Sequence, residues 1–235
     1  MDMNLIRGKR LLTLILGTVL LGLPSKELMA QFQWSPRIGI NAASVHAYTK
    51  NKENLDRDPN YLFTFGVSAD IPIYKRFHLQ PALMYAGKGY KDKEGLGGTF
   101  TAKVDYIDLP LHLLYKSPLG SGNMIVGVGP YFSFGLGGKW KSEKGILLDD
   151  ILIGEKGDIL FKEDGYVVES MPQYLYGKPF DYGGSFVLGY DILRTYSIQF
   201  HAQFGMEEHK SDWSYFHPDE YKKNRTYGIT FGYKF

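Results

Sequence analysis

The chain has 235 residues, a formal net charge of +2, no cysteine and a 15% share of aromatic residues. The near-neutral balance argues against nucleic acid as a partner, and the lack of cysteine excludes disulfides and thiolate metal sites. The length is that of a single domain, and abundant Tyr and Phe are typical of β-structure.

The opening 30 residues have the layout of a secretory signal peptide. Three basic residues ending at Arg10 precede an apolar run over Leu11–Leu23, and a small residue, Ala30, ends the segment. The run is shorter than a transmembrane helix usually needs, so a cleaved signal peptide is preferred over the alternative, an uncleaved N-terminal anchor. We expect a signal peptide at residues 1–30 and one domain at residues 31–235. Without a cysteine after the cleavage position, a lipoprotein is not expected.

Eight segments of the remaining chain alternate between apolar and small or polar residues. Because successive side chains of a strand point to opposite sides, this pattern predicts strands with one apolar face. Each segment is about long enough to cross a bilayer at a tilt. The segments lie at about residues 34–48, 61–71, 77–88, 104–116, 124–137, 182–192, 195–207 and 225–235.

The last segment shows the pattern most clearly. Tyr227, Ile229, Phe231 and Tyr233 alternate with small or polar residues up to Phe235. A soluble sheet rarely exposes such a strand at its edge, because it invites aggregation, whereas a closed barrel in lipid has no edge and places apolar residues outside. A strand that ends on Phe235 also predicts recognition by the barrel-assembly machinery.

The connections between these segments alternate between long and short. An up-and-down barrel with both termini in the periplasm needs four long outer loops and three tight inner turns. The sequence therefore predicts an all-β fold, an eight-stranded antiparallel up-and-down transmembrane barrel in a bacterial outer membrane. The long connections lie near residues 49–60, 89–103, 138–181 and 208–224, and the short ones near 74–76, 117–123 and 193–194.

The two faces of the predicted strands have different roles. The lumen of an eight-stranded barrel is just wide enough for its own side chains, so inward polar residues are expected to form a network of ion pairs and hydrogen bonds. The candidates for this network are Arg37, Asp70, His78, Gln80, Asp108, His112, Gln199, His201 and Gln203. The alternation also turns Lys88 and Asp191 inward. The candidates for lipid contact are Phe63, Phe65, Val67, Leu109, Leu111, Phe132, Leu188, Phe200, Phe204, Ile229 and Phe231.

Two structural expectations are open to direct test. The rival fold is a soluble lipocalin-like barrel, which would turn the apolar face inward around a ligand and leave Gln80 and Gln203 outside. Within the strands, Pro81, Pro110 and Pro130 each lack an N–H for the ladder, so we expect a β-bulge at one or more of them.

Catalytic chemistry has weak support in the sequence. His78, His112 and His201 are candidates for a buried relay or catalytic site with inward serines, but the Gly-x-Ser-x-Gly, His-Glu-x-x-His and nucleotide-binding motifs are absent. No cofactor is expected. The acidic residues of segment 138–181 do not have the spacing of a calcium-binding EF-hand, so no metal site is expected and a solvated loop is preferred. This loop is predicted either to fold over the barrel mouth or to extend the strands.

Aromatic residues of the last long connection, including Trp213 and Tyr215, lie among polar residues. Trp and Tyr are enriched where a protein meets lipid headgroups, so we favour that position over a binding site for a sugar or protein.

Six short motifs stand out along the chain: RIGIN at residues 37–41, LQPALMYAGKG at 79–89, YIDLPL at 106–111, GPY at 129–131, FDYG at 180–183 and GYKF at 232–235. Together these motifs resemble the PorT-like outer-membrane β-barrel family of Bacteroidetes-type bacteria. The resemblance implies an outer-membrane barrel. Most members have no assigned activity, and PorT itself is linked to secretion of proteases and adhesins.

Three functions follow as hypotheses. The leading one is a non-enzymatic barrel, structural or binding, whose outer loops meet lipopolysaccharide, a ligand or a cell-surface partner. The second is an accessory component of a protein secretion system. The third is a membrane-embedded enzyme that acts on lipid A or peptides.

Overall fold

The computed structural model describes residues 32–49, 57–93, 98–148, 151–161, 174–210, 212–213 and 220–235. The chain divides into two units, Met1–Phe32 and Gln33–Phe235. The predicted signal peptide at residues 1–30 lies outside the described residues. In the described part of the chain, no helix has the length and apolar character needed to cross a bilayer.

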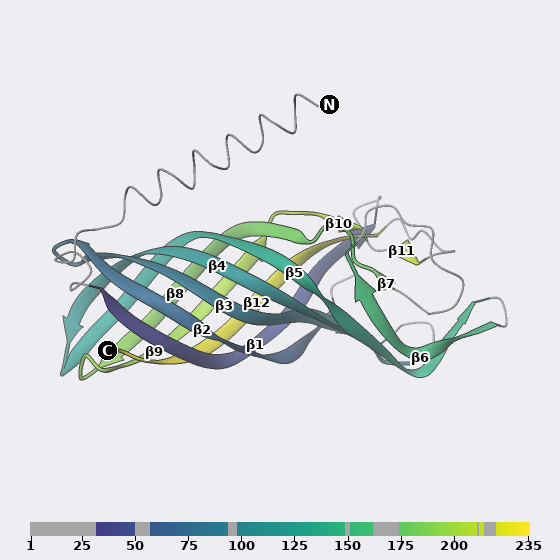
Figure 1. The fold of residues 1–235 in the computed structure, drawn as a ribbon, viewed down its shortest axis with the longest axis horizontal. Helices are drawn as coiled ribbons and strands as arrows, with labels where there is room; N and C mark the ends of the chain where they lie inside the picture. Colours follow the sequence, from purple (N-terminus) through teal and green to yellow (C-terminus); the bar gives the residue numbers. More distant parts are fainter. Residues whose placement is uncertain are drawn as a thin grey trace, which may run out of the picture. The chain divides into compact units, whose positions relative to one another are not determined.

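Eight strands of the second unit close into a barrel (Figure 1). Each pairs antiparallel with its neighbours, and β1 closes the ring because it pairs with both β2 and β12. The predicted eight-stranded up-and-down barrel is confirmed. Its strands are β1 (Gln33–Thr49), β2 (Asp58–Tyr74), β3 (Phe77–Asp92), β4 (Phe100–Leu119), β5 (Gly122–Leu148), β8 (Phe180–Ile192), β9 (Tyr196–Gly205) and β12 (Glu220–Tyr233).

The third long connection contains further strands. The first half of β5 pairs with β8, while its second half continues past the barrel and pairs with β6 (Ile151–Leu160). Figure 1 shows this β5–β6 hairpin projecting at the end opposite the C-terminus. The expectation that this connection extends the strands is therefore correct. The short strands β7 (Tyr174–Leu175), β10 (His209–Lys210) and β11 (Asp212–Trp213) add to the same end of the sheet.

Three short turns join barrel strands at the other end, as predicted. They lie at residues 75–76, 120–121 and 193–195. Gly120 has a φ of 58°, and the non-glycine residues Lys75 and Arg194 have φ values of 49° and 63°. The left-handed region suits the turns of antiparallel hairpins but is uncommon for residues with a Cβ atom.

The outward face of the barrel is apolar. Rows of large side chains run across neighbouring strands, since Ile38 of β1 lies opposite Phe65 of β2 and Phe231 of β12. Phe65 is 53% exposed, whereas Gln80 and Gln203 are 4% and 6% exposed. A soluble barrel with its apolar face turned inward requires the reverse, so the lipocalin-like alternative is excluded.

The expected β-bulges at the three mid-strand prolines are absent. The pairings that include Pro81, Pro110 and Pro130 keep a constant register. A missing N–H removes one ladder hydrogen bond but needs no inserted residue, so the strands can stay aligned. The register shifts lie elsewhere, for example between Asp105 and Tyr106 where β4 meets β5.

The inside of the barrel is apolar near the β5–β6 hairpin. We call the buried apolar residues at this level the aromatic cluster, and Phe100 and Phe161 pack against it. The rings of Phe100 and Trp140 stack with centroids 5.9 Å apart, and Tyr106 meets Phe161 edge to face at 5.6 Å. The cluster consists of Val45, Ala47, Tyr90, Ala102, Val104, Tyr106, Trp140, Ile159 and Tyr176.

Candidate functional site

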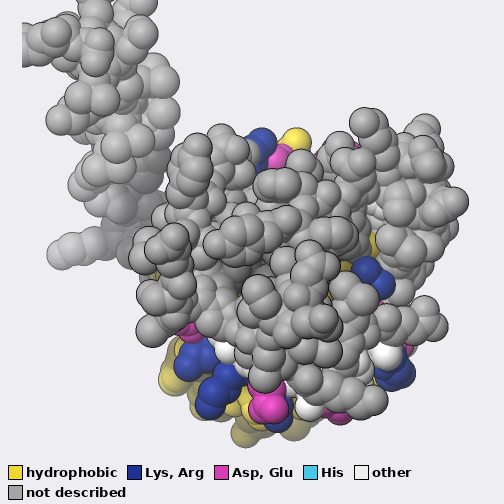
Figure 2. Space-filling view, turned by 90° about the vertical axis from the view of Figure 1, so that its right-hand side faces the viewer, with side chains coloured by type: hydrophobic (Ala, Val, Ile, Leu, Met, Phe, Trp, Pro, Cys, Tyr) yellow, Lys and Arg dark blue, Asp and Glu magenta, His cyan; other side chains and the backbone are white. Residues whose placement is uncertain are grey.

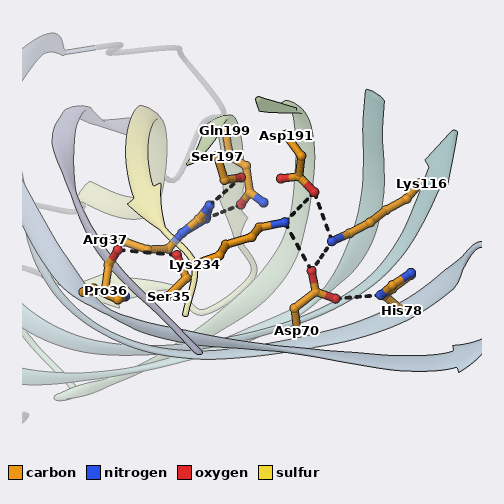
Figure 3. A network of polar contacts seen from close by, with 10 residues as sticks. All are labelled: Ser35, Pro36, Arg37, Asp70, His78, Lys116, Asp191, Ser197, Gln199 and Lys234. Carbon is orange, nitrogen blue, oxygen red and sulfur yellow. Dashed lines mark hydrogen bonds and ion pairs between the residues drawn. The ribbon is translucent and has the colours of Figure 1, made fainter. Parts of the chain in front are cut away.

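Charged side chains fill the barrel at the end that carries the short turns (Figure 3). Lys116 donates a hydrogen bond to Asp70 and another, 3.3 Å long, to Asp191. Lys234 donates to Asp191, and its Nζ atom lies 3.7 Å from Asp70. Two lysines and two aspartates thus alternate around a ring and neutralise one another. The turn-end cluster consists of these four residues with Arg37 and His78.

Arg37 and His78 flank this ring. The guanidinium of Arg37 donates to Gln199 Oε1 at 2.5 Å and to Ser197 Oγ at 3.2 Å, and both acceptors are neutral. His78 Nδ1 lies 2.7 Å from Asp70. The arginine therefore brings a positive charge that the two carboxylates of the ring do not balance.

The middle of the barrel holds a small central cavity of about 50 Å³. His112 Nε2 and Ser185 Oγ, which line it, are hydrogen-bonded at 2.8 Å. His201 Nε2, which also lines the cavity, lies 3.2 Å from Asn41 Oδ1. A cavity of this size has room for one or two water molecules but none for a peptide or an acyl chain.

A second charged group lies between the central cavity and the aromatic cluster. The Nζ atom of Lys88 is 3.1 Å from Asp108, 3.8 Å from Asp181 and 2.8 Å from Ser133 Oγ. It also lies 4.6 Å from the ring centroid of Tyr131. Because Tyr131 and Asn224 both donate to Asp181, the carboxylate has several partners. The Lys88 cluster consists of Lys88, Asp108, Tyr131, Ser133, Asp181 and Asn224.

A hollow larger than the central cavity opens at the turn end. This turn-end pocket has a volume of about 200 Å³. Its rim carries Lys75, Arg76 and Arg194 of the short turns, and its floor includes Lys116 and Lys234 of the turn-end cluster. The pocket is therefore strongly basic.

The predicted site residues divide clearly between inside and outside. Of the nine inward candidates, seven are buried, while His78 and His201 are half-buried. Of the eleven outward candidates, ten are exposed and Val67 is half-buried. The inward candidates do not form one site, since they are shared between the turn-end cluster, the central cavity and the Lys88 cluster.

The geometry offers little for catalysis. His112 and Ser185 form the contact that a nucleophile and its base require, but both are buried beside the small central cavity. His78, which is paired with Asp70, lines the open turn-end pocket, yet no serine or threonine lines that pocket. Among the described residues, no group of three or more acidic or histidine side chains is placed to hold a metal ion.

Lys116, Lys234 and Asp181 were not named for the predicted network, whereas Lys88 and Asp191 were already placed inward by the alternation. Lys116 and Lys234 also occupy the inward positions of their strands. Asp181 lies next to the predicted start of its strand, at residue 182, and so fell outside the pattern. In the fourth connection, Tyr215 lies outside the described residues, so its predicted headgroup position is untested.

Comparisons with solved structures give distant likenesses. Ail of Yersinia pestis is 11% identical with a TM-score of 0.40, and the match covers 87% of this chain and 99% of that one. OprG of Pseudomonas aeruginosa is 12% identical with a TM-score of 0.43, covering 86% and 95%. The outer membrane protease OmpT of Escherichia coli is 11% identical with a TM-score of 0.35, covering 86% and 97%. At these values the likenesses support no inference about activity.

The family comparison is decisive for the class of protein. A search of the curated proteins finds no match. The family model for the outer membrane protein beta-barrel domain matches residues 25–233, which is most of the chain and all eight barrel strands. With the apolar outer face and the closed ring of strands, this match shows that the chain belongs to the outer membrane protein beta-barrel domain family and lies in a bacterial outer membrane.

Proposed function

We propose that the protein is a non-enzymatic outer-membrane barrel that acts by binding at its extracellular surface rather than by conducting solutes. The observation that carries this proposal is the filled interior. The aromatic cluster and the Lys88 cluster occupy successive levels of the barrel, and the central cavity between them and the turn-end cluster measures only about 50 Å³. A solute would have to displace buried rings and ion pairs to pass.

The β5–β6 hairpin is the proposed binding surface. Lys141 lies directly opposite Lys156, and both side chains are exposed. Like charges in opposed positions destabilise a strand pair unless an anion lies near them. Figure 2, which faces this end, shows Lys and Arg side chains at several places around the hydrophobic wall of the barrel, with Asp and Glu side chains among them. The phosphate groups of lipopolysaccharide are anions of the right charge at the right membrane face.

Two measurements test this proposal. In a planar bilayer the purified protein should give no conductance steps, whereas a general porin measured alongside should give them. Binding to vesicles that contain lipopolysaccharide should weaken when Lys139, Lys141 and Lys156 are replaced by Gln. The matched control replaces Glu143, Glu155 and Asp158 by neutral amides, which should leave binding unchanged or strengthen it. Regular conductance steps, or equal loss of binding in both variants, would refute the proposal.

The PorT-like motifs support a second candidate, an accessory role in protein secretion. The motif at residues 79–89 lies within β3 and includes Lys88. Its residues therefore have a structural role in the barrel, and this role does not by itself specify secretion. Deleting the gene and comparing the exported proteins of mutant and parent cells tests this role. If the set of exported and surface-attached proteins is unchanged, the secretion candidate falls.

An enzymatic role has one specific observation in its favour, the hydrogen bond between His112 and Ser185. Its burial argues against it. The test is to replace Ser185 by Ala and assay the folded protein for cleavage of peptides and for deacylation of lipid A. We expect wild type and variant to be equally inactive. An activity in the wild type that Ser185→Ala abolishes would establish the enzyme.

A further inference from the structure

The turn-end pocket differs from the rest of the barrel interior in size and charge. It is about 200 Å³ in volume, whereas the central cavity is about 50 Å³. It opens between the turns at residues 75–76 and 193–195, so in the up-and-down topology it faces the periplasm. It is therefore accessible from the side of the membrane opposite the β5–β6 hairpin.

The charges that line this pocket are unbalanced. Five Lys and Arg side chains and His78 border it, with a single carboxylate, that of Asp191. Asp191 does not repel an anion as a free carboxylate would, because Lys116 and Lys234 both contact it (Figure 3). The pocket is thus floored by a neutralised ion-pair ring and surrounded by additional cations.

The rim cations lack acidic partners. Among the described residues, no carboxylate lies within ion-pair distance of Lys75, Arg76 or Arg194. Arg76 donates a hydrogen bond to the Tyr115 hydroxyl at 3.2 Å. Lys75 and Arg194 also hold left-handed backbone positions, with φ values of 49° and 63°. Such positions favour Gly or Asn and cost other residues free energy. Lys75 and Arg194 occupy them despite that cost.

The side chains around the rim indicate from which side of the protein an anion reaches the turn-end pocket. Apolar and aromatic side chains next to the same two turns are exposed on the outside of the barrel, among them Tyr74, Phe77, Leu193 and Tyr196. Aromatic residues at this level are typical of the boundary between hydrocarbon and headgroups. The rim cations therefore lie where a phospholipid phosphate reaches the pocket from the membrane and a soluble phosphate reaches it from the periplasm.

We propose that the turn-end pocket is a binding site for a phosphate group, held by Lys75, Arg76 and Arg194 at the rim and by the lysines of the turn-end cluster at the floor. Charge-assisted hydrogen bonds from Arg and Lys to phosphate oxygens are among the strong polar contacts in proteins. The volume accepts one phosphate group with a small attached headgroup and excludes an oligosaccharide.

The test uses the full folded protein in a neutral detergent and measures binding by calorimetry. The probes are inorganic phosphate, short-chain phosphatidylglycerol and short-chain phosphatidylcholine. The test variant is Lys75→Gln with Arg194→Gln, which alters only exposed rim residues. The matched control is Lys93→Gln with Lys103→Gln, which removes the same charge at the other end of the barrel.

We expect saturable binding of a phosphate-bearing probe and a loss of about tenfold in affinity in the rim variant, with the control variant unchanged. Binding of phosphatidylglycerol alone would assign the site to a lipid headgroup, and binding of inorganic phosphate that competes with the lipid would assign it to phosphate from either source. If no probe binds, or if both variants weaken binding equally, the proposal is wrong. Because the site lies at the periplasmic end, these results are independent of the lipopolysaccharide experiment on the β5–β6 hairpin.

Discussion

The ammonium group of Lys88 lies 3.1 Å from the carboxylate of Asp108 inside the closed barrel. Lys88 is only 1% exposed, and its charge is shared with Asp181, 3.8 Å away. Removing charges from water costs several kcal/mol per ion, roughly, and only good mutual contacts offset that cost. The stability of the Lys88 cluster therefore depends on the ammonium group of Lys88, which offsets the cost of burying the two carboxylates.

The first prediction concerns that lysine. Lys88→Met should lower the free energy of unfolding by about 3–5 kcal/mol, because it leaves two buried carboxylates without their cation. Urea titration of the protein folded into lipid vesicles measures the change. The control is Lys103→Met, since Lys103 is exposed and only 3.6 Å from Asp105, and the loss there should be under about 1 kcal/mol.

A companion variant separates lost charge pairing from lost packing. Adding Asp108→Asn and Asp181→Asn to Lys88→Met removes the uncompensated charges and should recover part of the lost stability. If the triple variant loses as much unfolding free energy as the separate substitutions do in sum, the lysine acts through packing rather than through charge.

The alternation of side chains was sufficient to predict the barrel. Residues such as Phe65 and Gln80 were placed on the correct faces because the pattern has a period of two, and one wrong step would invert every face. The alternation could not predict which inward residues meet, because contacts such as that of Lys116 with Asp191 depend on strand order, stagger and register together.

The aromatic cluster was missed for a related reason. Trp140 lies beyond the predicted end of its strand at residue 137, whereas Tyr106 lies on the inward face of the predicted strand at residues 104–116. Whether an inward residue should be polar or apolar depends on its level in the barrel, which sequence alternation does not encode. The same limit applies to β6, whose partner strand is recognisable only once β5 is seen to continue to Leu148.

The second prediction concerns the outward face. Ile229 is 54% exposed and lies between Ile40 and Phe200 of the neighbouring strands, within the apolar band. Ile229→Lys should destabilise the folded barrel in lipid by about 2–4 kcal/mol, the cost of a lysine near the bilayer midplane. The same vesicle titration measures it, with Ile229→Leu as the control that keeps an apolar side chain. A lysine variant as stable as the leucine variant would contradict the lipid-facing position.

The third prediction concerns the seam where the barrel closes. A Cβ atom added to Gly39 would lie 2.0 Å from the carbonyl oxygen of Ile229 on β12, so the two strands would have to move apart. We expect Gly39→Ala to cost about 1–3 kcal/mol, as overpacking does. Gly184→Ala is the matched control, because nothing lies within 4 Å of its added Cβ. Heat-modifiable mobility on gels should show a lower transition temperature for Gly39→Ala alone, and equal shifts in both variants would contradict the crowded seam.

The fourth prediction concerns the extracellular side, where Tyr48 donates a hydrogen bond of 2.6 Å to Glu208 Oε1 and Lys223 lies 3.2 Å from the same oxygen. The Tyr48 hydroxyl, and after it Lys223, hold the pKa of the Glu208 carboxyl below its ordinary value. Because the folded-state pKa is lowered, the stabilising contribution of this contact is present above the ordinary pKa and is lost as the pH falls through the lowered one. Tyr48→Phe should therefore raise the pKa of Glu208, as followed by carboxyl NMR during an acid titration. Tyr61→Phe, which alters an exposed tyrosine of β2, should leave that titration unchanged, and a midpoint that does not move in Tyr48→Phe would show that the hydroxyl does not stabilise the carboxylate.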